Sequence, residues 1–205
     1  MTNENFLIQG PVGQLEVTIT RPKVIEKSMT GIICHPHPLH GGTINNKVVA
    51  TLAKALDKLG LKTVRFNFRG VGKSQGQYDN GVGEAEDLKS VLRWVKHSWP
   101  QDDIWLAGFS FGAYIAAKVA NSQKIARLIS IAPPVFYEGF DALTQMTAAW
   151  LIIQGDQDEV VPFEQLKAFV NQVSSPVEFV VMSGASHFFH GRLIELRELL
   201  VRNLA

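Results

Sequence analysis

The sequence predicts an α/β fold in which a mostly parallel, twisted sheet carries helices on both faces. From residue 31 onward, short apolar runs alternate with segments whose apolar residues recur at helical spacing. Such alternation favours parallel strands joined by helical crossovers. At 205 residues the chain can bury one sizeable core, and no linker or internal repeat divides it. We therefore expect a single domain over residues 1–205.

The individual elements follow from local patterns along the chain. Residues 6–8 and 15–21 form strands without an intervening helix, so they should pair antiparallel at an edge of the sheet. Residues 47–59 place apolar side chains on one helical face, and Pro100 closes a helix over residues 84–97. The other predicted strands span residues 31–35, 61–68, 104–107, 126–132, 150–153 and 177–182, and the other predicted helices span residues 113–118, 163–173 and 193–204.

Composition and charge exclude several classes of protein. Hydrophobic residues make up 46% of the chain and charged residues 19%, which is typical of a globular protein in water. A net charge of +1 gives no electrostatic footprint for nucleic acid or an anionic membrane. No apolar run approaches the roughly 18 residues of a membrane span, and the first residues lack the pattern of a signal peptide. One cysteine excludes an internal disulfide, so we expect a cytoplasmic location.

A serine stands at a predicted strand-to-helix junction. Ser110 is the centre of Gly108-Phe109-Ser110-Phe111-Gly112, directly after the strand over residues 104–107. A turn this tight favours glycine two places away on each side, and it exposes the serine hydroxyl above the sheet as a nucleophile elbow does. The Phe111 N–H then lies at a helix N-terminus, where it can stabilise a developing oxyanion. The alternative is a glycine-rich turn with no chemical role.

An acid and a histidine follow Ser110 in the order expected for a hydrolytic triad. Asp156 and Asp158 both follow the strand over residues 150–153; we prefer Asp158 because it lies further into the loop, and we expect Asp156 to cap the turn. His187 follows the strand over residues 177–182, whereas His190 begins to enter the last helix. Because parallel strands end at the same edge of a sheet, these three loops can converge.

A histidine-rich loop follows the strand over residues 31–35. It reads Cys34-His35-Pro36-His37-Pro38-Leu39-His40-Gly41-Gly42, and the corresponding loop of such sites supplies a second oxyanion N–H. Because proline has no N–H, the donor is either His37 or Leu39, and we expect His37 because it is nearer the end of the strand.

The three histidines of this loop raise a rival hypothesis, a zinc site. The two prolines restrict the backbone around His37, and the spacing is not the helical one that aims two rings at one ion. We therefore expect no metal, with His35 and His40 as polar residues lining a cleft. Cys34 is interpreted as a small buried hydrophobic residue.

A second glycine-rich segment, Arg69-Gly70-Val71-Gly72-Lys73-Ser74, resembles a nucleotide-binding loop only superficially. A phosphate loop needs glycine at position 67, where the chain has asparagine, and the dinucleotide fingerprint fails because the third glycine is at 76 instead of 75. We expect this loop to form a wall of the substrate cleft, and we expect no nucleotide cofactor.

Taken together, these motifs resemble the α/β-hydrolase superfamily, and within it the small, lidless bacterial hydrolases related to carboxylesterases and dienelactone hydrolases. The matching segments cover most of residues 31–190. The resemblance implies Ser110 as nucleophile, Asp158 as acid, His187 as base, and no cofactor. The chain departs from the family pattern in having His-Pro-His-Pro where His-Gly is common. Because the nucleophile is serine, a dienelactone-type substrate is not carried over.

The function that these residues indicate is hydrolysis of a small acyl substrate, an ester or thioester, through an acyl-enzyme on Ser110. Residues 133–149 are too few for a cap domain, so the cleft should be open. The alternatives are a serine peptidase or thioesterase with the same triad and, from another class, a non-catalytic binding scaffold. The sequence indicates no nucleic-acid or membrane partner, and no oligomeric state can be read from it.

Overall fold

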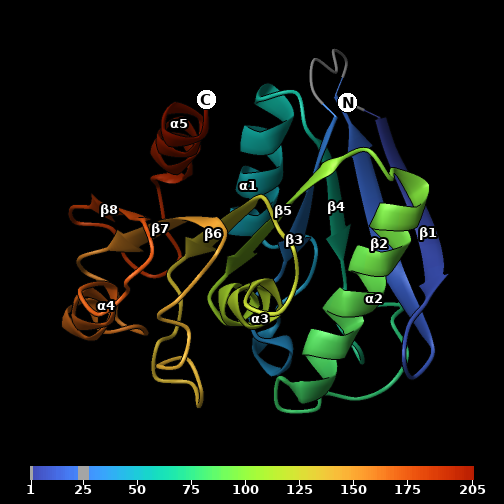
Figure 1. The fold of residues 1–205 in the computed structure, drawn as a ribbon, viewed down its shortest axis with the longest axis horizontal. Helices are drawn as coiled ribbons and strands as arrows, with labels where there is room; N and C mark the ends of the chain where they lie inside the picture. The colour runs from blue at the N-terminus through green and yellow to red at the C-terminus, as the bar shows by residue number, and fades with distance from the viewer. Residues whose placement is uncertain (1, 23–27) are drawn as a thin grey trace.

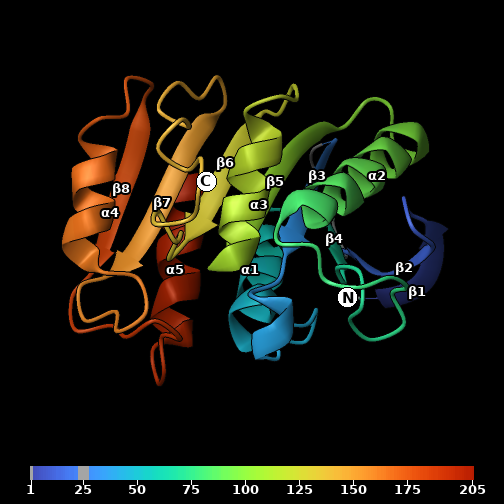
Figure 2. The same ribbon diagram turned by 90° about the horizontal axis from the view of Figure 1, so that it is seen from below.

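The sheet is eight-stranded and mostly parallel, with the strand order β1-β2-β4-β3-β5-β6-β7-β8 (Figures 1 and 2). The computed structural model describes residues 2–22 and 28–205. β1 pairs antiparallel with β2 at one edge, β2 pairs antiparallel with β4, and all later pairings are parallel. The strands are β1 Thr2–Gln9, β2 Gln14–Arg21, β3 Met29–Cys34, β4 Lys62–Phe66, β5 Asp103–Phe109, β6 Arg127–Ile131, β7 Ala149–Gly155 and β8 Val177–Met182.

Helices cover both faces of this sheet, as the sequence predicts. One face carries α1 and α5, and the other carries α2, α3 and α4 (Figure 1). The helices are α1 Lys47–Lys58, α2 Val82–Ser98, α3 Phe111–Ala120, α4 Phe163–Val170 and α5 Leu193–Leu204. Strand β5 shows why two cores form: Ile104 and Leu106 belong to one cluster of buried side chains, and Trp105, Ala107 and Phe109 belong to the other, because successive residues of a strand face opposite sides.

The predicted elements are confirmed, with differences at their ends. The strand expected over residues 61–68 ends at Phe66, since the chain turns away there and the Phe68 N–H donates to the ring of His35 instead of to a neighbouring strand. The helix expected over residues 163–173 ends at Val170.

Residues 132–148, between β6 and β7, contain neither a helix nor a strand, so no cap domain covers the sheet there. Among the described residues no helix has both the length and the apolar character that a membrane crossing requires.

A buried ion pair holds the long loop between β4 and α2. Arg69 donates to Asp87 through Nε and Nη2, at 3.0 and 2.8 Å, and the Arg69 N–H also donates to Asp87. Both side chains are buried, and Asp87 is fully so. Glu84 accepts the N–H groups of Asp79 and Gly81, which caps the start of α2. The loop therefore has a defined conformation although it contains several glycines.

We expect Asp87→Asn to lower the free energy of unfolding by about 3–5 kcal/mol, because it removes the buried carboxylate and leaves the buried Arg69 guanidinium with the exposed Asp79, 3.8 Å away. The matched control is Glu86→Gln, which removes the neighbouring carboxylate from an exposed pair with Lys89 and should cost less than about 1 kcal/mol. Urea unfolding measured by circular dichroism compares the two. Equal losses for both variants would contradict this role for the buried pair.

Candidate active site

Ser110 occupies a strained turn between β5 and α3. Its backbone has φ 53° and ψ −123°, a positive φ that non-glycine residues rarely adopt. A Cβ at Gly108 would lie 2.3 Å from the backbone of Gly112, and a Cβ at Gly112 would lie 2.4 Å from the Cys34 carbonyl oxygen. Glycine is therefore required at both positions, and the turn projects the Ser110 hydroxyl from the carboxyl end of the sheet.

His187 reaches Ser110 from the loop between β8 and α5. Its Nε2 lies 3.1 Å from Ser110 Oγ although 77 residues separate the two. The ring packs against the side chains of Phe109 and Phe188, each with its centroid 5.0 Å away, and His187 is only 2% exposed. The ring thus packs between two aromatic side chains, while its two nitrogens contact polar atoms.

Asp158 lies on the other side of the His187 ring. Asp158 Oδ2 is 2.8 Å from His187 Nδ1, and Oδ1 accepts the N–H groups of Val160 and Val161 at 2.8 and 2.7 Å. Gln154 Nε2 donates to Oδ2 at 3.0 Å. Burial alone would raise the pKa of Asp158, but the hydrogen bond from His187, the backbone N–H groups of Val161 and Val160, and the electrostatic attraction of the imidazole outweigh it and hold that pKa below its ordinary value. The carboxylate is therefore ionised at neutral pH, and it fixes the proton of the imidazole on Nδ1.

The neighbouring polar residues support the loops that carry this chain of contacts. Asp156 accepts the Gly184 N–H and the Ser183 hydroxyl, so it ties the loop after β8 to the loop after β7. Glu159 Oε2 accepts the backbone N–H of His187 at 3.1 Å. His190 is exposed and contacts the Phe188 ring. Sequence reasoning missed Gln154 and Glu159; a polar residue directly after the apolar run 150–153 was the available signal for Gln154.

His35 differs from the expectation that it lines a cleft: it is completely buried. The Phe68 N–H donates to His35 Nε2 at 3.0 Å, so the ring proton is on Nδ1, which lies 2.7 Å from the Pro36 carbonyl oxygen. This hydrogen bond orients the Pro36 carbonyl, and because a peptide unit is planar and trans it also orients the N–H of His37 on the opposite side. Cys34 is buried, as predicted.

The sequence predicts that the backbone N–H groups of His37 and Phe111 face an oxyanion. Among the described residues, neither the His37 N–H nor the Phe111 N–H donates to a protein acceptor. The Leu39 N–H, the alternative to His37, donates to His37 Nδ1 at 3.2 Å. The His37 ring centroid lies 5.0 Å from that of Phe111, the residue after Ser110. The loop after β3 therefore lies beside the start of α3.

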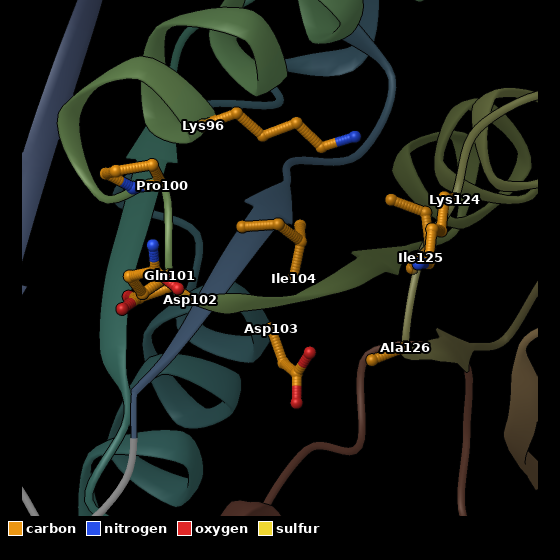
Figure 3. Close-up of a pocket in the computed structure, with 9 residues that line it drawn as sticks. All are labelled: Lys96, Pro100, Gln101, Asp102, Asp103, Ile104, Lys124, Ile125 and Ala126. Carbon is orange, nitrogen blue, oxygen red and sulfur yellow. The ribbon is translucent and has the colours of Figure 1, made fainter.

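Two of the hollows in the surface lie at opposite ends of the strands. One, of about 240 Å³, lies between the loop after β3 and the glycine-rich loop after β4, with Leu39, Gly70 and Tyr78 in its lining. The other, of about 380 Å³, surrounds Asp103 at the start of β5 (Figure 3). Ser110 follows the other end of that seven-residue strand, roughly 20 Å away, so the hollow of Figure 3 is not part of this site.

Comparison with known proteins identifies the family. Residues 39–148 match the family model of the alpha/beta hydrolase fold. An alpha-beta serine hydrolase homologue from Coxiella burnetii is 87% identical over 100% of this chain and 99% of that chain, with a TM-score of 0.98. An α/β serine hydrolase without lid from Xanthomonas campestris is 41% identical over 98% of this chain and 93% of that chain, with a TM-score of 0.94.

The chain belongs to the α/β-hydrolase family. It is a small, lidless α/β hydrolase, as the motifs of its sequence indicate. Est1E from Butyrivibrio proteoclasticus, whose structure has ferulic acid bound, has the same fold, with a TM-score of 0.87 at 22% identity over 97% of each chain. These neighbours support a hydrolase function for the chain.

The buried, neutral His35 makes stability depend on pH. Burial lowers the pKa of His35 to about 4, whereas an imidazole in the unfolded chain has a pKa of about 6.5. Between these values the unfolded state binds the extra proton, so the protein loses stability as pH falls from 6.5 to 4, by about 1.4 kcal/mol per pH unit at the steepest. His35→Gln, which keeps an acceptor for the Phe68 N–H, should flatten this dependence in urea unfolding series. An unchanged pH dependence in the variant would contradict the assignment of the buried neutral ring.

Proposed function

We propose that the protein hydrolyses small carboxylic esters or thioesters through an acyl-enzyme on Ser110. The observation that carries this proposal is the position of one imidazole between an alcohol and a carboxylate, with Ser110 Oγ 3.1 Å from Nε2 and Asp158 Oδ2 2.8 Å from Nδ1. With the ring proton on Nδ1, the lone pair of Nε2 faces the Ser110 hydroxyl. His187 can then act as the general base and Asp158 as the group that orients it.

In the first half of the reaction, Ser110 Oγ attacks the carbonyl carbon of the substrate while His187 Nε2 takes the hydroxyl proton. The carbonyl oxygen becomes an oxyanion, and the N–H groups of Phe111 and His37 donate to it. The bond to the leaving group then breaks, and His187 returns the proton to the departing alcohol or thiol. The product of this half is an ester between the acyl group and Ser110.

In the second half, water replaces the alcohol as nucleophile. His187 Nε2 takes a proton from the water as its oxygen attacks the acyl carbon, and the same N–H groups hold the second oxyanion. The bond to Ser110 Oγ breaks, and Oγ regains its proton from His187. The carboxylic acid leaves, and the site returns to its starting protonation state without a cofactor.

The apolar side chains that are exposed beside the site favour an apolar substrate. Leu39 is 68% exposed in the loop after β3, and Phe188 is 42% exposed beside His187. No secondary structure in residues 132–148 closes over them. Exposed apolar side chains beside a site that no cap domain covers favour small acyl groups over long chains that need an enclosed tunnel. The ester chemistry is supported by the esterases among the neighbours in fold, from Pyrococcus furiosus and Rhodothermus marinus.

We expect Ser110→Ala to lower kcat for p-nitrophenyl acetate by at least about a thousandfold, because it removes the atom that is acylated. A fluorophosphonate probe should label the wild-type protein and spare the variant, as read by intact-protein mass spectrometry. Near-normal hydrolysis by the variant would refute Ser110 as nucleophile. A series of p-nitrophenyl esters of increasing chain length should show the rate falling as the acyl group lengthens.

Asp158 and Asp156 both lie in the loop after β7, so substitutions at the two positions can be compared directly. Asp158→Asn should lower kcat by about 10³–10⁴-fold, because the amide no longer fixes the ring proton on His187 Nδ1. Asp156→Asn, which affects the contacts to Ser183 and Gly184, should cost less than about tenfold. Steady-state kinetics on the same ester compare the two. The reverse ranking would assign the orienting carboxylate to Asp156.

A further inference from the structure

Tyr78 is a polar residue beside the site that the reaction does not use directly. It lies in the loop between β4 and α2, and its hydroxyl oxygen is 3.2 Å from Nε2 of His37. The rings of His37 and Tyr78 are 5.0 Å apart, and both contact the ring of Phe111, at 5.0 and 6.0 Å. The contact joins residues that are 41 positions apart in the chain.

The direction of this hydrogen bond follows from the other nitrogen of the ring. His37 Nδ1 accepts the Leu39 N–H, so it carries no proton. Burial and repulsion from His40 lower the pKa of His37, so the ring is neutral at pH 7 and its one proton is on Nε2. Burial raises the pKa of Tyr78, which keeps the phenol protonated. Nε2–H therefore donates to the Tyr78 hydroxyl oxygen.

Several further hydrogen bonds fix the conformation of His37. His37 caps the short 3₁₀ turn Pro38–His40 through its ring, and its carbonyl oxygen accepts the N–H groups of His40 and Gly42. A Cβ at Gly42 would lie 2.0 Å from the Pro36 carbonyl oxygen, so the two ends of this loop approach closely at a position that only glycine fits. The Phe68 N–H ties the base of this loop to the chain after β4 through His35, and the bond to Tyr78 ties the His37 ring to the opposite side of the hollow.

Tyr78 can serve as a fixed anchor because its own loop is fixed. The next residue, Asp79, donates its N–H to Glu84 at the start of α2, and the buried pair of Arg69 and Asp87 holds the base of the loop. A Cβ at Gly83 would lie 2.0 Å from the Arg69 guanidinium, which shows how closely the helix packs on the loop. Tyr78 therefore lies in a loop that hydrogen bonds fix to α2.

We propose that Tyr78 is a positioning residue for catalysis: by accepting a hydrogen bond from the His37 ring, it holds the His37 N–H in the orientation that stabilises the oxyanion. This inference rests on the proposed function, since it assumes that the His37 N–H meets an oxyanion. Tyr78 acts through His37 and does not itself touch the reacting atoms. Its effect should therefore appear in the transition state and not in the binding of the substrate.

Tyr78→Phe removes the acceptor and keeps the ring contacts with His37 and Phe111. We expect kcat for p-nitrophenyl acetate to fall about three- to tenfold, the range for one hydrogen bond, with KM changed less than twofold. Binding of an alkylboronic acid, which forms a tetrahedral adduct with Ser110, should weaken by the same factor. The control is Tyr137→Phe: Tyr137 also contacts Phe111, at 5.9 Å, and its hydroxyl has no hydrogen bond to any residue that the structure describes. It should keep wild-type kinetics.

A double-mutant cycle tests whether Tyr78 acts through the His37 ring. His37→Ala removes the ring and keeps the backbone N–H, so adding Tyr78→Phe to it should have no further effect on kcat. A full additional loss in the double variant would overturn the proposal, because Tyr78 would then act by another route. An unchanged kcat in Tyr78→Phe alone would overturn it as well.

A spectroscopic measurement keeps this inference separate from the proposed function. In the wild-type protein, ¹⁵N NMR of the His37 ring should show the proton on Nε2, and in Tyr78→Phe the ring signals and the backbone amide signals of His37 and Gly42 should shift or broaden. Unchanged signals would refute the coupling even if the enzyme is an esterase. If the wild-type protein neither hydrolyses esters nor reacts with a fluorophosphonate, the proposed function fails, while the NMR result still decides whether Tyr78 fixes His37.

Discussion

The backbone conformation of Ser110 is the constraint on which the rest of the site depends. A positive φ at a non-glycine residue costs roughly 1–3 kcal/mol, and here the surrounding structure enforces it. The Ser110 N–H donates to Ile131 of β6, and the Ser110 carbonyl oxygen accepts the N–H of Ala113 in the first turn of α3. Gly108 and Gly112 let β5, α3 and β3 approach more closely than any side chain would allow. The same turn places Phe111 directly after Ser110, at the start of α3, where its N–H donates to no acceptor among the described residues.

The sheet topology then explains why residues so far apart in the chain meet. β5, β7 and β8 run parallel, so Ser110, Asp158 and His187 all follow carboxyl ends at one edge (Figure 1). The loops there are tied to one another: Asp156 joins the loop after β7 to the loop after β8, and Glu159 holds the backbone of His187. The charge of Asp158 is retained despite burial because its oxygens accept several N–H groups. A preorganised set of this kind needs little rearrangement when a substrate binds.

Much of the fold, and the meeting of these three residues, could be predicted because each rests on a local pattern. The strand–helix alternation, the Gly-x-Ser-x-Gly turn and the order of acid and histidine are visible in short windows of sequence. His35, Gln154 and Tyr78 could not be placed in this way. His35 was expected in a cleft but bonds to Phe68, 33 residues away, and Tyr78 meets His37 across two loops. Such contacts depend on the path of the loops in three dimensions, and a single sequence carries no direct signal for them.

Catalysis through an acyl-enzyme requires a covalent bond between the acyl group of the substrate and Ser110. This is tested most directly by mixing the protein with a slowly deacylating p-nitrophenyl ester, stopping the reaction in acid within seconds, and mapping the acyl group by peptide mass spectrometry. We expect one acyl group on the peptide that contains Ser110, formed at the rate at which p-nitrophenol is first released. Hydrolysis without any such adduct, or an adduct on a different residue that forms and decays at the turnover rate, would contradict the account.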